Sequence, residues 1–255
     1  MTVIDDLLAA VPAGQERILD VRIGAAWTAV VAEVDGARRS GLAATLSRIG
    51  HDGPSVRNAG HLHECSSQEL CELARSDSPA EVSVGIAAIN ALLPRAPSTW
   101  VDINASDVLA ERGADKAVAL VGHFPFVDWL RARVKTLWVL ELAPQAGDLP
   151  ASAAAEVIPQ ADIIALTSMT LLNHTFDGLM ALRRPDAPVM LLGPSTPLTP
   201  LLFDYGVQLL SGAVVEEIDA VLRGVSQGAG FRQLHRLGVR LVTMARTQGF
   251  PGLRY

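Results

Sequence analysis

"KAVALVGHFPF", residues 116–126, is the stretch that decides the fold. Its first six residues are nearly all apolar, which predicts a strand buried on both faces. Further apolar runs follow at similar intervals, and segments of helical character separate them. Strands that alternate with helices form a parallel sheet covered by helices. The predicted strands are "KAVALVG" (116–122), "TLWVLEL" (136–142), "DIIALTS" (162–168), "PVMLLGP" (188–194) and "GVQLLSG" (206–212), with helices near 126–133, 151–159, 174–183 and 198–205.

The first hundred residues have a different order of elements. A short amphipathic helix in 1–14 precedes two antiparallel strands in 18–34, which are broken near Gly24. Two helices follow, over 66–76 and 78–94. Strands followed by helices predict a separate α+β lobe. The proline-containing stretch "PRAPSTW" (94–100) is the best linker, so we predict one domain over 1–96 and a second over 97–255.

Composition excludes several classes of partner. The chain has 255 residues, of which 49% are hydrophobic, and a net charge of -6. No basic stripe is present, so nucleic acid is not an expected partner. No apolar run reaches the roughly 18 residues that a membrane span needs. The N-terminus lacks the basic region of a signal peptide, so we expect a cytoplasmic protein with reduced thiols. The oligomeric state stays open, with a homodimer as one candidate.

Small and polar residues follow each predicted strand of the second half. In an open parallel sheet, ligands bind beyond the carboxyl ends of the strands. Each residue type also has a structural alternative: glycines permit turns, Asn173 caps a helix, and Phe124 packs under the next helix while His123 caps a carbonyl group. The predicted ligand-binding residues here are Gly122, His123, Phe124, Glu141, Thr167, Thr170, Asn173, Gly193 and Ser195.

His123 and Glu141 form the candidate metal site. Right-handed crossovers favour neighbouring positions for the first two strands of the predicted sheet, which would bring Glu141 beside the "GHFPF" loop. A carboxylate there would hold one tautomer of the imidazole, and the pair could bind a cation or an organic ligand. The alternative is an ion pair that only closes the loop. A divalent metal ion is therefore a candidate cofactor.

A second group of possible metal ligands lies in "HDGPSVRNAGHLHECSSQELC" (51–71). Zinc and copper prefer these residue types. The spacing of the two cysteines, however, matches no established metal motif, and loop histidines are usually polar surface residues. The role of this group stays open; its members are His51, His61, His63, Glu64, Cys65 and Cys71.

Several motifs together resemble one known family. They are "VGHFPF", "LEL-P--GD-P", "ADIIALTSMTLLNHTFDGLM" and "LLGPSTPLTPLLFDYGVQLLSG", with "RIGAAWTAVV", "SGLAATL" and "VGIAAINALLP" in the first half. In this order they resemble the putative heavy-metal chelation family, over nearly the whole chain. The resemblance implies an α/β protein: an N-terminal α+β lobe like the N-terminal domain of enolase, then a Rossmann-like parallel sheet with helices on both faces. It also implies a ligand site in the cleft between the two domains.

The expected function is binding of a small molecule or a metal-linked compound in that cleft. Gly41 and its neighbours to Thr45 are predicted to face the cleft near His123, because small residues let a backbone approach a ligand. A simple strand-to-helix turn is the alternative. The alternative function is an S-adenosylmethionine- or nucleotide-binding enzyme that uses the Rossmann-like half. "GHFPFV" lacks the G-x-G-x-x-G pattern, so ordinary NAD binding is not expected, and no motif defines a reaction.

Overall fold

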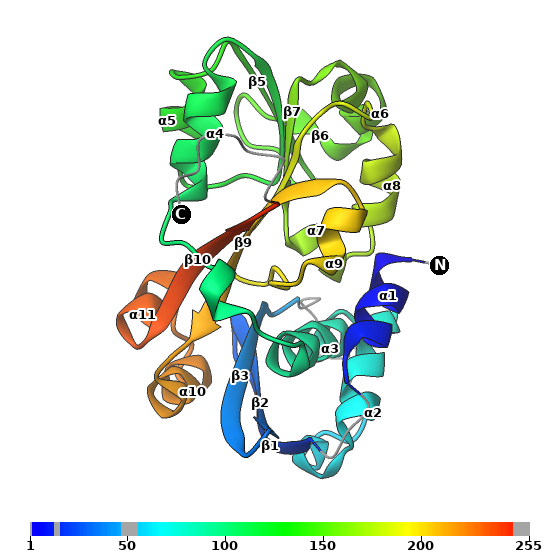
Figure 1. The fold of residues 1–255 in the computed structure, drawn as a ribbon, viewed down its shortest axis with the longest axis vertical. Helices are drawn as coiled ribbons and strands as arrows, with labels where there is room; N and C mark the ends of the chain where they lie inside the picture. Colours follow the sequence, from blue (N-terminus) through cyan, green and yellow to red (C-terminus); the bar gives the residue numbers. More distant parts are fainter. Residues whose placement is uncertain (1, 13–15, 47–55, 247–255) are drawn as a thin grey trace. The chain divides into compact units, whose positions relative to one another are not determined.

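The computed structural model describes residues 2–12, 16–46 and 56–246. The chain divides into two compact units (Figure 1). Unit 1 comprises Met1–Ala96, Pro194–Leu201 and Gly212–Leu241, and unit 2 comprises Pro97–Gly193, Leu202–Ser211 and Val242–Tyr255. Both the units and the predicted domains break after residue 96. Two later segments join unit 1, so the division into domains over 1–96 and 97–255 stays a prediction.

Unit 1 contains a three-stranded antiparallel sheet in the order β1-β2-β3. The first helix ends before Pro12, and Thr2 caps its start through the amide of Asp5. The two predicted strands are present, but the segment around Gly41 is a third strand rather than a turn into a helix. The elements are α1 (Val3–Ala10), β1 (Arg17–Ile23), β2 (Trp27–Val34) and β3 (Ala37–Ala44).

Helices cover both faces of this sheet (Figure 1). On one face α3 packs against β2 and β3, and on the other α10 packs against β1 and β2. The second contact builds a core in which Ala29, Val31 and Leu42 meet buried residues from Val215 to Val239. The helices of this unit are α2 (Ser67–Glu72), α3 (Pro79–Leu92), α10 (Ile218–Ser226) and α11 (Phe231–Arg236), with 3-10 turns at Leu62–Glu64 and Leu73–Arg75.

The larger sheet has seven strands in the order β10-β9-β8-β7-β4-β5-β6. All its pairs from β8–β9 to β5–β6 are parallel. At the other edge, the backbone amide of Arg246 donates to the carbonyl of Gln208, and the backbone amide of Glu216 donates to that of Gly238. β10 therefore runs antiparallel to β9. The strands are β4 (Ala117–Val121), β5 (Thr136–Glu141), β6 (Leu149–Pro150), β7 (Ile163–Thr167), β8 (Val189–Leu192), β9 (Val207–Val215) and β10 (Val239–Ala245).

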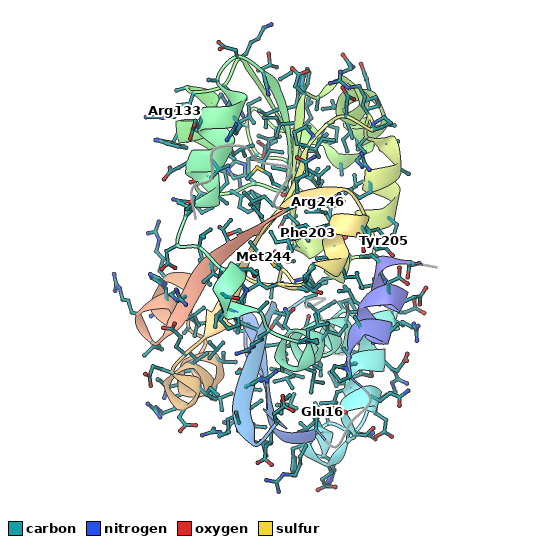
Figure 2. All side chains as sticks on the ribbon, in the orientation of Figure 1. Glu16, Arg133, Phe203, Tyr205, Met244 and Arg246 are labelled. Carbon is teal, nitrogen blue, oxygen red and sulfur yellow. The ribbon has the colours of Figure 1, made fainter. Side chains whose placement is uncertain are left out.

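Helices flank the part of this sheet in unit 2, as predicted (Figure 1). Its core joins side chains of α4, α5 and the neighbouring strands. At the end of β10, Arg246 donates to the carbonyl of Phe203 in α9 (Figure 2). The remaining helices are α4 (Ala105–Gly113), α5 (Val127–Arg131), α6 (Ala154–Val157), α7 (Met169–Leu172), α8 (Phe176–Leu182) and α9 (Leu201–Asp204), with 3-10 turns at Pro97–Thr99, Ala151–Ala153 and Ile158–Gln160.

The α/β fold class is thus confirmed, with a small antiparallel sheet beside a mostly parallel one. The elements α4, α10, α11 and β10 were not expected from the sequence. Among the residues that the structure describes, none of the helices combines the length and the apolar character needed to span a bilayer.

Candidate functional site

The chain turns sharply where β4 ends. The amide of Gly122 still donates to the carbonyl of Leu140, so β4 and β5 are neighbours up to this point, as predicted. Gly122 then adopts a φ of 100°. A Cβ at this position would lie 2.9 Å from Cβ of Thr167 on the neighbouring β7. Glycine is therefore required both for the turn and for the close approach of two strand ends.

Glu141, the last residue of β5, fixes the loop that follows this turn. Its Oε2 accepts a hydrogen bond of 2.8 Å from the backbone amide of His123. Its Oε1 accepts another of 2.8 Å from the amide of Leu142. The sequence placed Glu141 beside the "GHFPF" loop, and the structure does the same. Both carboxylate oxygens are bonded to backbone amides, however, and not to the imidazole.

The carboxylate that meets the imidazole is that of Asp148. Nδ1 of His123 lies 2.8 Å from Oδ2 of Asp148, which also accepts the amide of Gln145 at 3.0 Å. The Asp148 side chain is 0% exposed, whereas that of His123 is 26% exposed. The imidazole partner expected from the sequence, Glu141, is therefore wrong. Asp148 is the "GD" aspartate of the second family motif, and that motif was the signal that could have identified it.

Asp148 is held in its ionised form. Its burial alone would raise the pKa of the carboxyl group, but hydrogen bonds from the Gln145 amide and the His123 ring outweigh burial and hold that pKa below its usual range. Because a carboxylate can only accept, the His123 nitrogen facing it must carry the proton. Oδ1 of Asp148 is buried and has no hydrogen-bond partner among the described residues.

This arrangement leaves Nε2 of His123 as the reactive atom of the cluster. With the proton fixed on Nδ1, the neutral ring presents a lone pair at Nε2. Metal-binding histidines almost always donate their other ring N–H to a carboxylate, a carbonyl group or water. The residues present therefore fit a metal centre in which His123 is the ligand and Asp148 orients it. The same geometry would also suit a general base.

Phe124 has the packing role that was its structural alternative. Its ring stacks on that of Phe126, with centroids 5.0 Å apart and an angle of 22° between the planes. Both rings are partly buried against the core of unit 2. Leu142, by contrast, is 73% exposed directly after Glu141. The loop after β4 thus has an aromatic base packed on the core, and the loop after β5 begins with an exposed leucine.

The other predicted residues of unit 2 mainly shape the ends of β7 and β8. Oγ1 of Thr170 donates to the carbonyl of Thr167 at 2.8 Å and is buried. Gly193 has a φ of 127°, and its amide donates to the carbonyl of Ser211. Asn173 accepts hydrogen bonds from the amide and hydroxyl of Thr175, at the turn between α7 and α8. A ligand-binding role for these residues stays a prediction.

Gly41 and Ser195 belong to unit 1. A Cβ on Gly41 would lie 2.0 Å from the carbonyl oxygen of Ala87, so the backbone that approaches Gly41 closely is that of α3. Oγ of Ser195 accepts the amide of Ala44 at 2.8 Å. These contacts give both residues a packing role, and their part in ligand binding, like the site between the two predicted domains, stays a prediction.

Three side chains, including that of Ser195, form hydrogen bonds with backbone groups along the outer edge of β3. Nδ2 of Asn90 donates to the carbonyls of Leu42 and Ser195, both at 3.0 Å. Arg95 donates to the carbonyl of Ser40 at 2.9 Å. Side chains thereby satisfy backbone groups that another strand would otherwise bind.

The role of the histidine and cysteine group in residues 51–71 stays open. Nδ1 of His61 and Nε2 of His63 lie 3.2 and 3.7 Å from Oε1 of Glu64. Cys65 and Cys71 are free thiols. In the parts of the chain that the structure describes, no three such side chains are arranged to hold a metal ion. His51 lies outside the described residues.

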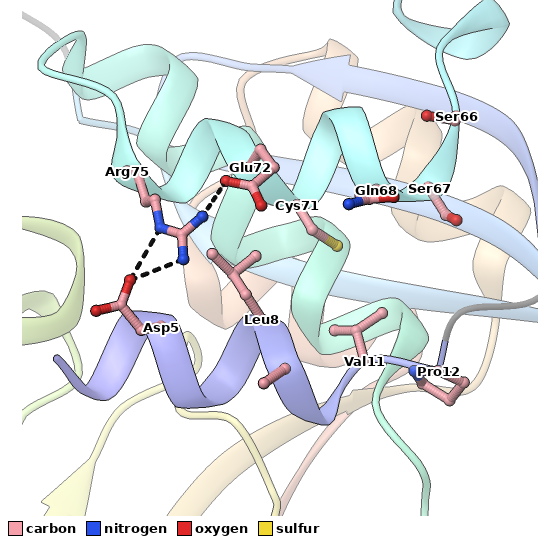
Figure 3. Close-up of a pocket in the computed structure, with 11 residues that line it drawn as sticks. Asp5, Leu8, Val11, Pro12, Ser66, Ser67, Gln68, Cys71, Glu72 and Arg75 are labelled. Atoms are coloured by element: carbon pink, nitrogen blue, oxygen red, sulfur yellow. Dashed lines mark hydrogen bonds and ion pairs between the residues drawn. The ribbon is translucent and has the colours of Figure 1, made fainter. Parts of the chain in front are cut away.

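Two cavities lie in unit 1, on either side of α2, and neither is lined by a predicted ligand-binding residue. The larger, of about 510 Å³, lies between α1 and α2 (Figure 3). The smaller has a volume of about 340 Å³. At one end of the larger cavity, Arg75 is paired with both Asp5 and Glu72 (Figure 3). Its guanidinium group is therefore already neutralised.

Known proteins resemble the chain over both halves. A family model described as "Putative heavy-metal chelation" matches residues 104–244, and a second model with the same description matches residues 4–93. An uncharacterized protein of Methanocaldococcus jannaschii is 24% identical over 213 residues, which cover 81% of this chain and 82% of that protein.

Two crystal structures of proteins of unknown function, both assigned to the family of the first model, have the same fold. The protein from Desulfitobacterium hafniense DCB-2 superposes with a TM-score of 0.83 at 24% identity, over 96% of this chain and 98% of that one. The protein from Pyrococcus horikoshii has a TM-score of 0.79 at 20% identity, over 95% and 98% of the two chains.

Proposed function

The chain belongs to the putative heavy-metal chelation family, and from this premise we propose that it binds a divalent metal ion carried by a small chelating molecule, with Nε2 of His123 as the protein's ligand. One observation carries the proposal: the 2.8 Å contact between Nδ1 of His123 and the buried carboxylate of Asp148. A buried carboxylate that orients an imidazole is the usual second layer of a histidine–metal site.

The neighbouring carboxylates support a metal that brings other ligands with it. Both oxygens of Glu141 accept backbone amides, and Oδ2 of Asp148 accepts two hydrogen bonds. Oδ1 of Asp148 is buried, so the cluster offers the imidazole nitrogen as its accessible donor atom. Imidazole suits zinc, copper, nickel and iron. In this proposal the remaining coordination positions are filled by the chelating molecule and by water.

The free thiols support a reducing compartment, and we place the protein in the cytosol. Cys71 is buried, and burial raises the pKa of its thiol to about 12. That thiol is consequently a poor ligand at neutral pH, since metals bind the thiolate. Burial therefore argues against Cys71 as the metal ligand.

Calorimetric titration with a nickel(II)–ethylenediamine complex tests the proposal. His123→Gln is expected to weaken binding at least tenfold, and Asp148→Asn by roughly 10- to 100-fold because it frees the ring. His63→Gln is the matched control, since His63 is more exposed but has no buried carboxylate partner. Wild-type affinity in His123→Gln would exclude His123 as the ligand. Parallel thermal shifts with S-adenosylmethionine and with nucleotides test the alternative function.

A further inference from the structure

We infer that the chelating molecule is flat and apolar, and that it packs against Leu142 while its metal meets Nε2 of His123. This inference rests on the proposed function and specifies the class of ligand. It comes from the surface beside the imidazole, on the loop that follows β5.

Leu142 is the most exposed large apolar residue among those that the structure describes. Its exposed fraction is 73%, compared with 41% for Ile23 and for Leu241 and 37% for Trp129. A leucine that projects this far loses the free energy that burial would give, roughly 1.5–3 kcal/mol for a complete side chain. A ligand that covers it recovers part of that free energy.

Glu141 fixes Leu142 next to His123. One carboxylate accepts the backbone amides of both residues, each at 2.8 Å. The two side chains therefore leave the backbone at points bridged by a single carboxylate group. On this inference, Leu142 is within reach of a broad ligand whose metal is bound to His123, but not of a small one.

Contacts within the protein hold both loops in place before a ligand binds. The stacked rings of Phe124 and Phe126 anchor the loop after β4 to the core, and Asp148, from the loop after β5, holds the imidazole of His123. Pro125, which separates Phe124 from Phe126 in the sequence, further restricts the backbone. A surface that is fixed in advance favours rigid ligands, because little ordering entropy is lost on binding. Flat conjugated nitrogen chelators have this rigidity and an apolar face.

A comparison of two nickel(II) complexes of equal charge distinguishes the effect of the chelator's shape and polarity on affinity from the effect of metal binding itself. Nickel(II)–1,10-phenanthroline is flat and apolar, whereas nickel(II)–ethylenediamine is small and polar. Both carry two positive charges and leave coordination positions open to imidazole. The measured quantity is the ratio of their affinities for the protein, divided by the same ratio for free imidazole, with the heat of the His123→Gln variant subtracted.

For the wild-type protein, the ratio of phenanthroline-complex affinity to ethylenediamine-complex affinity is expected to be about tenfold larger than the same ratio for free imidazole. Leu142→Ser is expected to reduce this preference at least fivefold while leaving the ethylenediamine affinity unchanged. Leu241→Ser removes another exposed leucine, and it is expected to keep the wild-type preference.

An unchanged preference in Leu142→Ser would overturn the inference, even if His123→Gln abolishes binding of both complexes; the proposed function would then stand. Loss of a dimer in Leu142→Ser, seen by sedimentation, together with an unchanged preference would assign Leu142 to a subunit contact and also overturn it. If both complexes bind His123→Gln as tightly as wild type, the proposed function fails, and this inference fails with it.

Discussion

The backbone amide of His123 donates a hydrogen bond of 2.8 Å to Oε2 of Glu141. Glu141, at the end of its strand, thus binds the main chain of the loop that carries His123. The imidazole ring contacts a different carboxylate. Position and orientation of His123 are therefore controlled by two different acids: Glu141 sets the backbone, and Asp148 sets the ring.

Glu141→Gln should loosen this loop without removing a metal ligand. The amide of glutamine offers one acceptor oxygen where two backbone amides now bind, so one backbone donor loses its charged partner. We expect the free energy of unfolding to fall by about 1–3 kcal/mol. Affinity for nickel(II)–ethylenediamine should fall less than in His123→Gln.

Chemical denaturation and calorimetry check this prediction together. Glu156→Gln is the control, because Glu156 is an exposed residue in α6. If Glu141→Gln keeps full stability and loses all binding, Glu141 is itself a ligand and the role given to it here is wrong.

Gly41→Ala should strongly destabilise unit 1. The added Cβ would lie 2.0 Å from the carbonyl oxygen of Ala87 and 2.4 Å from the amide nitrogen of Ala91, and backbone atoms of a packed helix cannot move cheaply. We expect a loss of roughly 3 kcal/mol or more, at the upper end of the cost of overpacking.

Gly178→Ala is the matched control for Gly41→Ala. Gly178 lies inside α8, and a Cβ there would meet nothing within 4 Å. This substitution should raise stability by about 0.5–1 kcal/mol. Equal effects of the two substitutions in urea denaturation would contradict the close packing of β3 on α3.

Glu81 should make stability depend on pH in the acidic range. Its side chain is 4% exposed. Burial alone would raise the pKa of this carboxyl group, but hydrogen bonds from Arg57 and Ser76 outweigh burial and hold that pKa below the usual value of 4.5. The folded pKa is thus below the unfolded one. The stabilisation is complete above pH 4.5 and is lost as the pH falls through the lowered pKa.

Glu81→Gln is therefore expected to flatten the decline of the unfolding free energy below pH 4.5, while reducing stability at pH 7. Glu111→Gln, at an exposed position of α4, should keep the wild-type slope. Identical slopes for wild type and Glu81→Gln, measured by urea denaturation at several pH values, would show that the Glu81 carboxylate is not stabilised by Arg57.

The two cysteines should differ in reactivity. Cys71 lines the larger cavity, yet its residue is only 2% exposed, and burial raises the pKa of its thiol to about 12. At pH 8 iodoacetamide should label Cys65 in the native protein and Cys71 only after unfolding. Mass spectrometry of tryptic peptides distinguishes the two, and rapid native labelling of Cys71 would contradict this assignment.

The part of the candidate site that could be predicted from the sequence is the part that depends on the order of the strands. Alternating strands and helices made β4 and β5 neighbours, and this alone placed Glu141 beside His123. Asp148 was missed because it lies in an irregular loop 25 residues from His123, where no periodicity links the two. Which carboxylate meets the imidazole depends on a tertiary contact of that loop.

The strand β3 and the later helices were missed for a related reason. "ARRSGLAA" contains neither β-branched nor aromatic residues, so its strand character comes from pairing with β2 and packing under α3. Helices α10 and α11 follow the last predicted strand, and the apolar partners that stabilise them are Ala29, Val31 and Leu42 in unit 1. The apolar spacing of Val221, Leu222 and Val225 is helical and could have indicated α10, but no local pattern could indicate which sheet it packs against.

The shared core of unit 1 also constrains how the protein is made. Its strands leave the ribosome early, but the apolar residues that cover one face of them, from Val215 to Val239, are translated on the order of 10 s later. During that interval Ala29, Val31 and Leu42 lack their partners, which is a period suited to chaperone binding. Nascent chains stalled shortly after residue 96 should accordingly remain sensitive to protease, and protection should arise only once Val239 has emerged.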